Sequence, residues 1–253
     1  MAVSIDPIHQ FELKPLVSLG HIGNQEIAFT QSALYMFAAV GVIALITIVA
    51  TSGRSVVPGR MQSLAEVFYE FIADTLHQAT GDGGKRFLPL VFSLFMFLCV
   101  SNLVGVIPYT FTISSHLIVT VALALLVFFT VLIYGVAKNG LKFFKIFVPH
   151  GVPGYILPLV MFIEVLSFFL RPVSHSVRLF ANMLAGHIAL KVFAGFVAML
   201  GFSLGAVGWV GGVLPLALTI ALYALEILVA FLQAYVFAIL TCIYLNDAIH
   251  PGH

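Results

Sequence analysis

The chain has 253 residues, of which 61% are hydrophobic and only 8% are charged, and its mean hydropathy is +1.13. A soluble domain needs a polar surface, so this balance excludes one and predicts a single integral membrane domain over residues 1–253. The net charge of +1 and the scattered Lys and Arg exclude a nucleic-acid-binding arm. Cys99 and Cys242 match neither a disulfide framework nor a metal-ligand spacing, and we expect neither a metal nor a cofactor.

The N-terminal part predicts an outer segment followed by a first membrane span. Residues 1–32 are mixed and polar, with more acidic than basic side chains, which is typical of a segment on the outer side. The first span covers residues 33–50, and Arg54 and Arg60 follow it. Because positive charge accumulates on the inner side of membranes, that end of the span is predicted to be cytoplasmic.

Residues 60–79 predict an amphipathic helix that lies on the inner surface and does not cross the membrane. Apolar residues recur at helical spacing there, and acidic side chains occupy the other face. Ser63 and Glu66 have the spacing of a capping box, which predicts the start of the helix. A helix packed on a partner subunit fits the pattern equally well and leaves the topology unchanged.

Residues 87–137 predict a hairpin of two spans, 87–107 and 117–137, each long enough to cross about 30 Å of hydrocarbon. Lys and Arg flank the start of the first span and the end of the second, so both of these ends are predicted to be cytoplasmic. Asn102 lies within the first span. It either lines a polar path or forms a hydrogen bond to a neighbouring helix.

Residues 154–249 contain two apolar stretches that are each longer than a single upright membrane span requires. The stretch 154–204, which includes Pro172, predicts either two spans with a turn at that proline or one kinked helix that is strongly tilted. The glycine-rich stretch 201–212 predicts an outer turn. Residues 213–245 would reach roughly 50 Å as one helix, so this segment must also tilt or extend beyond the bilayer.

Arg178 is the strongest functional signal, because a cation at mid-membrane depth costs roughly 3 kcal/mol or more and needs a partner or water. At helical spacing one stripe contains Arg171, Ser174, His175, Arg178, Asn182 and Ala185. His187 falls on the opposite face and Glu226 is the only charge of the last span, so we expect these two residues to form a pair. The alternative is that the polar residues form a loop at the lipid surface between two spans.

Several motifs together resemble the subunit a family of the F-type ATP synthases over nearly the whole chain. The central one is Arg178-Leu-Phe-Ala-Asn182-Met-Leu-Ala-Gly186-His187, and the next predicted helix carries Glu226 and Gln233 seven residues apart. Supporting matches are Glu164-Val-Leu-Ser167, Arg171-Pro172-Val-Ser174, and Ser101-Asn102-Leu before Pro108. This family includes the stator of a membrane proton motor.

The resemblance implies an all-α polytopic membrane protein with five crossing helices, one surface amphipathic helix, and a steeply tilted last hairpin. It implies that Arg178 faces the carboxylates of a rotating c-ring and separates two aqueous half-channels, with Gln233 close to it. His187 and Glu226 are then expected to line the outer half-channel, and Glu164, Ser167 and Ser174 the inner one. The partners implied are the c-ring, peripheral-stalk b-type subunits, the rest of the synthase and membrane lipid, and the subunit itself would be non-catalytic.

One departure narrows the source of the chain. Many bacterial members of the family have an acid where this chain has His187 and a histidine where it has Glu226. This exchanged pair resembles the alphaproteobacterial and mitochondrial branch, and we favour a bacterial inner membrane with the N-terminus outside and the C-terminus inside. The weaker alternatives are a haem-binding electron-transfer subunit that uses His175 and His187, and a secondary transporter.

Overall fold

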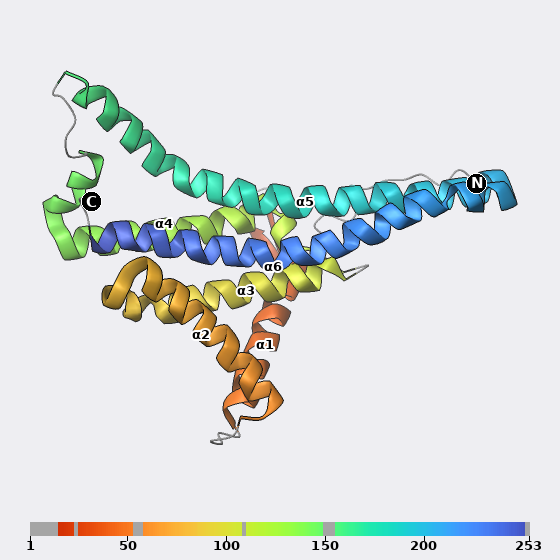
Figure 1. Cartoon of the computed structure of the whole chain (residues 1–253), viewed down its shortest axis with the longest axis horizontal. Coiled ribbons are helices and arrows are strands. Elements are labelled where there is room, and N and C mark those ends of the chain that lie inside the picture. The colour runs from red at the N-terminus through yellow and green to blue at the C-terminus, as the bar shows by residue number, and fades with distance from the viewer. Residues whose placement is uncertain (1–14, 23–24, 53–57, 108–109, 149–154, 251–253) are drawn as a thin grey trace. The chain divides into compact units, whose positions relative to one another are not determined.

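The structure of the chain is a computed structural model (Figure 1). It describes residues 15–22, 25–52, 58–107, 110–148 and 155–250. Arg54, most of the first half of the expected outer segment, and the start of the expected last hairpin at residue 154 lie outside the described residues. The two strands are β1 (Pro15–Ile22) and β2 (Gln25–Thr30). The helices are α1 (Gln31–Ser52), α2 (Arg60–Thr80), η2 (Gly81–Phe87), α3 (Leu88–Val106), η3 (Ile113–Ser115), α4 (Leu117–Asn139), η4 (Gly140–Phe147), α5 (Leu157–Gly211) and α6 (Val213–Ile249).

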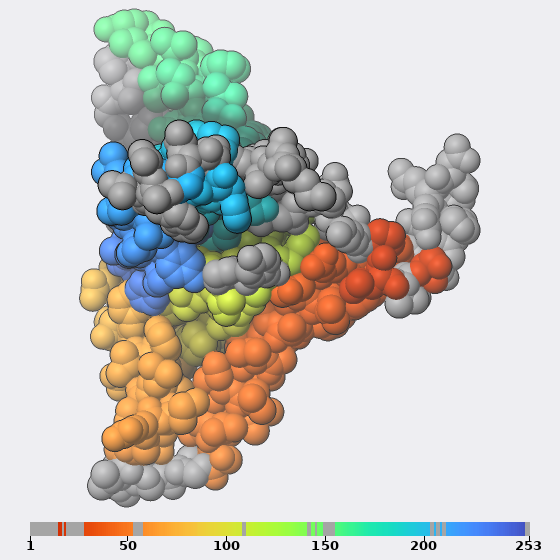
Figure 2. All heavy atoms as spheres, turned by 90° about the vertical axis from the view of Figure 1, so that its right-hand side faces the viewer, coloured from red at the N-terminus to blue at the C-terminus, as the bar shows by residue number. Residues whose placement is uncertain are grey.

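Five helical segments are long and apolar enough to cross a membrane, and they contain α1, α3, α4, α5 and α6. Their outward side chains are apolar, as hydrocarbon requires: on α1, Phe37 is 69% exposed and Ile48 is 65% exposed. The surface of α1 lies open along the face seen in Figure 2. The predicted fold class, an all-α polytopic membrane protein with five crossing helices, is confirmed.

The N-terminal segment contains a feature that the sequence interpretation missed. β1 and β2 pair antiparallel, with Ile22 opposite Gln25. The dipeptide Gly23-Asn24 connects them in the sequence. A two-residue Gly-Asn connection between two short apolar runs is a typical hairpin signal, so the sequence did contain the information.

α2 forms where amphipathic periodicity predicts it, but its start differs from the capping-box prediction. Gly59 is the N-cap residue, no side chain caps the helix, and the backbone N–H of Ser63 donates to the Gly59 carbonyl at 2.8 Å. The Ser63 prediction was therefore wrong. The reason is that Glu66 accepts a hydrogen bond from Gln62 one turn earlier, and the chain is already helical at Ser63.

α5 continues as a helix through Pro172, so the alternative of two spans with a turn at that proline is excluded, and the non-helical backbone of Gly205 divides its 55 residues into two helical parts. At about 1.5 Å per residue the part before Gly205 is roughly 70 Å long, which is far more than an upright span needs. The non-helical residue Gly205 lies within the turn expected over residues 201–212, and only Gly212 separates the end of α5 from α6. Gly205 interrupts the helix with φ 56°, a conformation that glycine adopts without the strain of a side chain.

The chain forms two compact units, and each contains segments of several helices. Unit 1 consists of Met1–Val42, Leu98–His116 and Leu179–Gln233. Unit 2 consists of Ile43–Phe97, Leu117–Arg178 and Ala234–His253. Organisation as a single membrane domain stays a prediction.

In unit 2 the ends of α4 and α6 lie together. The side chain of Asn139 donates to the carbonyl of Ala248 at 2.7 Å, and the Lys138 ammonium lies 3.4 Å from the carbonyl of Ile249. These carbonyls belong to the last turn of α6, where no amide of the same helix is available to them. The two helices therefore end on the same side, as expected if both cross in the same direction.

Candidate functional site

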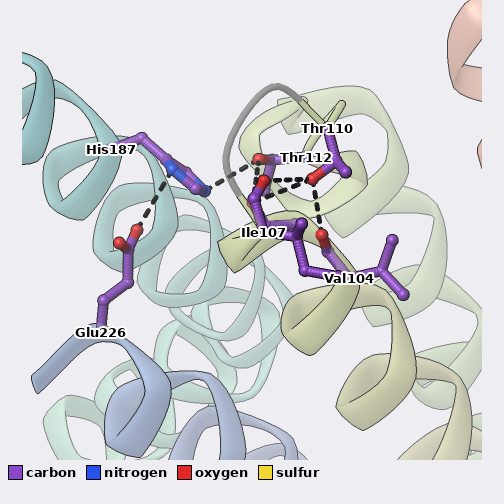
Figure 3. Close-up of polar contacts among 7 residues, drawn as sticks. Val104, Ile107, Thr110, Thr112, His187 and Glu226 are labelled. Carbon is purple, nitrogen blue, oxygen red and sulfur yellow. Dashed lines mark hydrogen bonds and ion pairs between the residues drawn. The ribbon is translucent and has the colours of Figure 1, made fainter. Parts of the chain in front are cut away.

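His187 on α5 and Glu226 on α6 face each other in unit 1 (Figure 3). His187 Nδ1 lies 3.2 Å from Glu226 Oε1, and the two residues are only 7% and 5% exposed. The structure thus brings together the two titratable groups that the sequence interpretation expected to form a pair. A base and an acid at this distance can exchange a proton directly, or through one water molecule if they separate slightly.

The Glu226 carboxyl group is unusual for a buried acid. Both of its oxygens are buried and neither has a hydrogen-bond partner within the part of the chain that the structure describes. Gly186 provides the space for it, because a Cβ at this position would lie 3.0 Å from Glu226 Oε1. Burying an unsatisfied carboxyl group costs free energy, so this arrangement does not stabilise the fold. It leaves a carboxyl group whose lone pairs are available to accept a proton.

A polar cluster at the end of α3 supports the other side of His187. The Thr112 hydroxyl lies 2.8 Å from His187 Nε2, and both side chains are buried. α3 ends at Val106, and the sequence has a proline two residues further on, which is typical of a helix end. The Thr110 hydroxyl then lies 2.6 Å from the Val104 carbonyl and 2.7 Å from the Ile107 carbonyl, so its one hydrogen can be donated to either acceptor at the end of the helix.

Asn102 is fully buried and joins three segments of unit 1. Its side-chain amide nitrogen donates to the Ala230 carbonyl on α6 at 3.2 Å. Its side-chain oxygen accepts a short hydrogen bond from the Ser114 hydroxyl. Of the two roles considered from the sequence, the structure provides the hydrogen bond to a neighbouring helix, and a role in lining a polar path stays a prediction.

Asn182 and Gln233 form a second bridge between α5 and α6 in unit 1. The Asn182 side-chain nitrogen donates to the Gln233 side-chain oxygen at 2.9 Å. Gln233 is 5% exposed, whereas Asn182 is exposed. The two helices of the hairpin are therefore joined by polar contacts at two levels, as is typical of helices in membranes, where hydrophobic burial does not drive their association.

The residues expected for the inner half-channel follow one open stripe of α5 in unit 2. Ser167, Ser174 and Arg178 are exposed, and Glu164 is half-buried. The Arg178 guanidinium forms no ion pair with the described residues of this chain. This stripe is therefore polar, faces outward and carries an unneutralised cation.

His175 does not share that open stripe, which differs from the expectation. It is 4% exposed and lies between Phe237 and Tyr244 of α6, with ring centroids 3.8 and 5.9 Å away. Its Nε2 is buried without a hydrogen-bond partner among the described residues. The reason is the angular step of about 100° per residue, which turns His175 away from Ser174 and toward α6.

Arg171 also differs from its neighbours on the stripe, because it has a partner in the chain. Its guanidinium forms an ion pair with Asp247 near the end of α6 and lies 5.1 Å from the Tyr244 ring centre. Both charged side chains are about a quarter exposed. Arg171 therefore joins α5 to the end of α6 in unit 2 and is not available as a free cation.

Thr112 and Ser114 are the residues that the sequence interpretation missed. They occur in a short polar run from Thr110 to His116 between two predicted spans, which was treated only as a connection. The signal was the density of hydroxyl side chains, since four of those seven residues are Ser or Thr. Hydroxyl groups at the end of a membrane helix can satisfy its carbonyls and can also reach a neighbouring helix.

Comparisons with known proteins agree with the resemblance seen in the sequence. A family model described as ATP synthase A chain matches residues 33–246. ATP synthase subunit a of Bradyrhizobium diazoefficiens is 80% identical over 251 residues, which cover 99% of this chain and 100% of that protein. ATP synthase subunit a of Rhodopseudomonas palustris is 74% identical with the same coverage. That of Nitrobacter winogradskyi is 69% identical over 98% of this chain and 100% of that protein.

These relatives come from bacteria and are matched over their whole length, and the family match over residues 33–246 includes most or all of each of the five apolar segments. The hydrophobic composition, the apolar helices and the bacterial relatives together indicate a multi-pass protein of a bacterial inner membrane. The chain therefore belongs to the ATP synthase A chain family and is a proton-translocating membrane subunit of the ATP synthase complex.

Proposed function

We propose that this subunit passes protons through two aqueous half-channels to and from the carboxylates of a rotating c-ring, with Arg178 between the half-channels. The observation that carries the proposal is the open stripe of α5, on which Arg178 is exposed without an ion-pair partner among the described residues. An unneutralised cation in a membrane helix needs a partner from outside the chain or water. A carboxylate on a neighbouring subunit meets that need.

Arginine suits this role because it stays protonated under all accessible conditions. A fixed positive charge repels a passing proton and cannot transfer one by titrating, so it prevents a leak between the half-channels. It also favours the ionised form of a carboxylate within about 4 to 6 Å, so a ring subunit loses its proton beside Arg178. At an effective dielectric constant near 20 such a pair at 4 Å is worth roughly 4 kcal/mol, an attraction that must remain modest for the ring to turn.

The outer half-channel is proposed to use the buried cluster of unit 1. His187 and Glu226 take up protons there, supported by Asn102, and Asn182 and Gln233 lie on the path toward the ring. The unpartnered oxygens of Glu226 support this assignment, because a group that accepts and releases protons needs accessible lone pairs. Water entering the site would satisfy these oxygens.

The inner half-channel is proposed to follow Glu164, Ser167 and Ser174, which share the open stripe with Arg178. The C-terminus is proposed to lie inside and the N-terminus outside, and Lys138 at the end of α4 supports this orientation because positive charge accumulates on the cytoplasmic side. The subunit itself is proposed to be non-catalytic, with nucleotide chemistry in other subunits of the complex. Its direct partners are proposed to be the c-ring and peripheral-stalk b-type subunits.

Replacement of Arg178 in the assembled synthase tests the proposal. Arg178→Ala should abolish proton-driven ATP synthesis in membrane vesicles while the complex still assembles, and Arg178→Lys should fail almost as badly because an ammonium lacks the planar fork. Arg60→Ala is the control, because Arg60 is an exposed cation on α2 and not on the stripe. Synthesis above a few per cent of wild type in Arg178→Ala would contradict the proposed role.

The side from which each half-channel opens is tested separately. Cysteine at Ser167 or Ser174 should react with a membrane-impermeant thiol reagent from the cytoplasmic side, and cysteine at Glu226 from the outer side. The background must lack Cys99 and Cys242, which are both buried. Labelling of both sets from the same side would contradict two separate half-channels.

A further inference from the structure

Thr112 contacts His187 from the side opposite Glu226 (Figure 3). The imidazole ring has two nitrogens, and the structure gives each a different neighbour: Nε2 faces the Thr112 hydroxyl at 2.8 Å, and Nδ1 faces Glu226 Oε1 at 3.2 Å. Thr112 is 3% exposed and His187 is 7% exposed, so bulk water does not compete with this contact. The orientation of the ring therefore depends on Thr112.

We infer that Thr112 is a positioning residue for proton transfer in the outer half-channel, which holds the His187 ring so that Nδ1 faces Glu226. The inference rests on the proposed function of His187 and Glu226. It adds a residue from the connection after α3, which contacts His187 at 2.8 Å. A proton transfers efficiently only over a short, aligned path, and a misplacement of about 1 Å can cost up to about 100-fold in rate.

A hydroxyl group suits this position better than an amide or a charged group. It has one donor and two acceptor lone pairs, so it can donate to an unprotonated Nε2 or accept from a protonated one. In its accepting state the Thr112 proton can turn to the Gly105 carbonyl, which lies 3.4 Å away. His187 can therefore gain or lose a proton at either nitrogen without losing the contact that orients it.

Gly105 determines where Thr112 lies. A Cβ built on Gly105 would lie 2.8 Å from Thr112 Cγ2, which is closer than real Cβ atoms approach another atom, and 3.2 Å from the hydroxyl oxygen. Any larger residue at this position on α3 must therefore displace the Thr112 side chain. Serine at position 112 lacks the Cγ2 methyl group and removes the closest of these contacts.

Two substitutions of Thr112 separate hydroxyl chemistry from packing. Thr112→Val keeps the shape and removes the hydroxyl, so passive proton flux through membranes stripped of the soluble ATPase should fall roughly five- to tenfold. Thr112→Ser keeps the hydroxyl and should retain at least about half of the flux. Thr120→Val is the matched control, because Thr120 is equally buried but its hydroxyl bonds only the Leu117 carbonyl of its own helix.

Gly105→Ala gives a second, independent arm. Alone it should reduce the flux about as much as Thr112→Val, because it displaces the hydroxyl from His187. The double variant Gly105→Ala with Thr112→Ser should recover part of that loss, since serine lacks the methyl group that the new Cβ would meet. Each flux is divided by the amount of assembled complex, so that a loss of protein is not read as a loss of transport.

The outcomes distinguish this inference from the proposed function. The positioning role would be overturned if Thr112→Val and Thr120→Val had equal proton flux. It would also be overturned if Thr112→Ser lost as much flux as Thr112→Val. Glu226→Gln and His187→Ala are measured in parallel. Normal proton flux in both Glu226→Gln and His187→Ala would overturn the proposed outer half-channel itself. Reduced flux in these two variants together with normal flux in Thr112→Val would overturn the positioning role alone.

Discussion

The chain contains two buried histidines on the same helix, and their surroundings differ completely. In unit 1, His187 lies between a hydroxyl and a carboxyl group, at 2.8 and 3.2 Å. In unit 2, His175 lies between Phe237 and Tyr244, and its Nε2 has no hydrogen-bond partner among the described residues. Only twelve residues of α5 separate them.

The comparison shows that burial does not by itself identify a proton-transfer group. Both rings are less than 10% exposed, so both lose hydration. Among the residues that the structure describes, the neighbours that can pass or receive a proton lie beside His187, and they come from α6 and from the connection after α3. Polar partners from other elements, and not depth in the protein, distinguish the functional ring from the packed one.

Replacing each histidine with leucine is the most direct test of this difference between His175 and His187. His187→Leu should reduce ATP-driven proton pumping in inverted vesicles by roughly tenfold or more, because it removes a positioned acid–base group. His175→Leu should reduce pumping by less than about threefold, because the ring acts mainly through packing against Phe237. Equal losses in the two variants, at equal amounts of complex, would mean that the surroundings of the rings do not decide their roles.

Exchanging the acid and the base sharpens the comparison within unit 1. His187→Glu alone places two acids at the site and Glu226→His alone places two bases, so each should slow proton uptake, since like charges oppose each other's ionisation. The double variant restores one acid and one base. Its pumping should exceed the product of the two single defects by several-fold, as expected for residues in contact. Strict additivity would show that His187 and Glu226 do not share a proton path.

Gly186→Ala tests whether the Glu226 carboxyl group needs the space beside it. The added Cβ would lie 3.0 Å from Oε1, so the carboxyl group must shift and pumping should fall roughly threefold. Alanine also favours a helix over glycine by about 1 kcal/mol, so a loss of stability should not be the cause. Gly41→Ala on α1, where no atom lies within 4 Å, is the control and should pump normally.

The smallest expected effect concerns the ion pair of unit 2, which we expect to matter for stability and little for transport. Asp247→Asn weakens the contact with Arg171 and should lower the free energy of unfolding by about 1 to 2 kcal/mol. Asp82→Asn is the control, because Asp82 pairs with Lys85 in a fully solvated position. Thermal unfolding of the assembled complex measures both, and a loss of pumping larger than the loss of stability in Asp247→Asn would contradict a structural role.

Much of this protein could be predicted from its sequence, because the determining physics is local. A helix must present apolar side chains over about 20 residues to cross hydrocarbon, so composition predicts the apolar segments, although it left open one or two spans over residues 154–204 until the family resemblance implied five crossing helices. The cost of a buried charge marks Arg178 and Glu226 as functional in the same way. Helical angles also predicted that His187 faces Glu226, since the helix is continuous from Arg178 through His187.

Only the tertiary structure decided which groups complete the site. Thr112 reaches His187 because Thr110 bonds the last carbonyls of α3 and the glycine at position 105 lets the connection lie against that helix. His175 turns toward aromatic rings because α6 happens to present Phe237 at that level. Contacts between residues 60 to 130 positions apart depend on how the helices end and meet, and the local pattern of apolar and polar residues carries no information about that geometry.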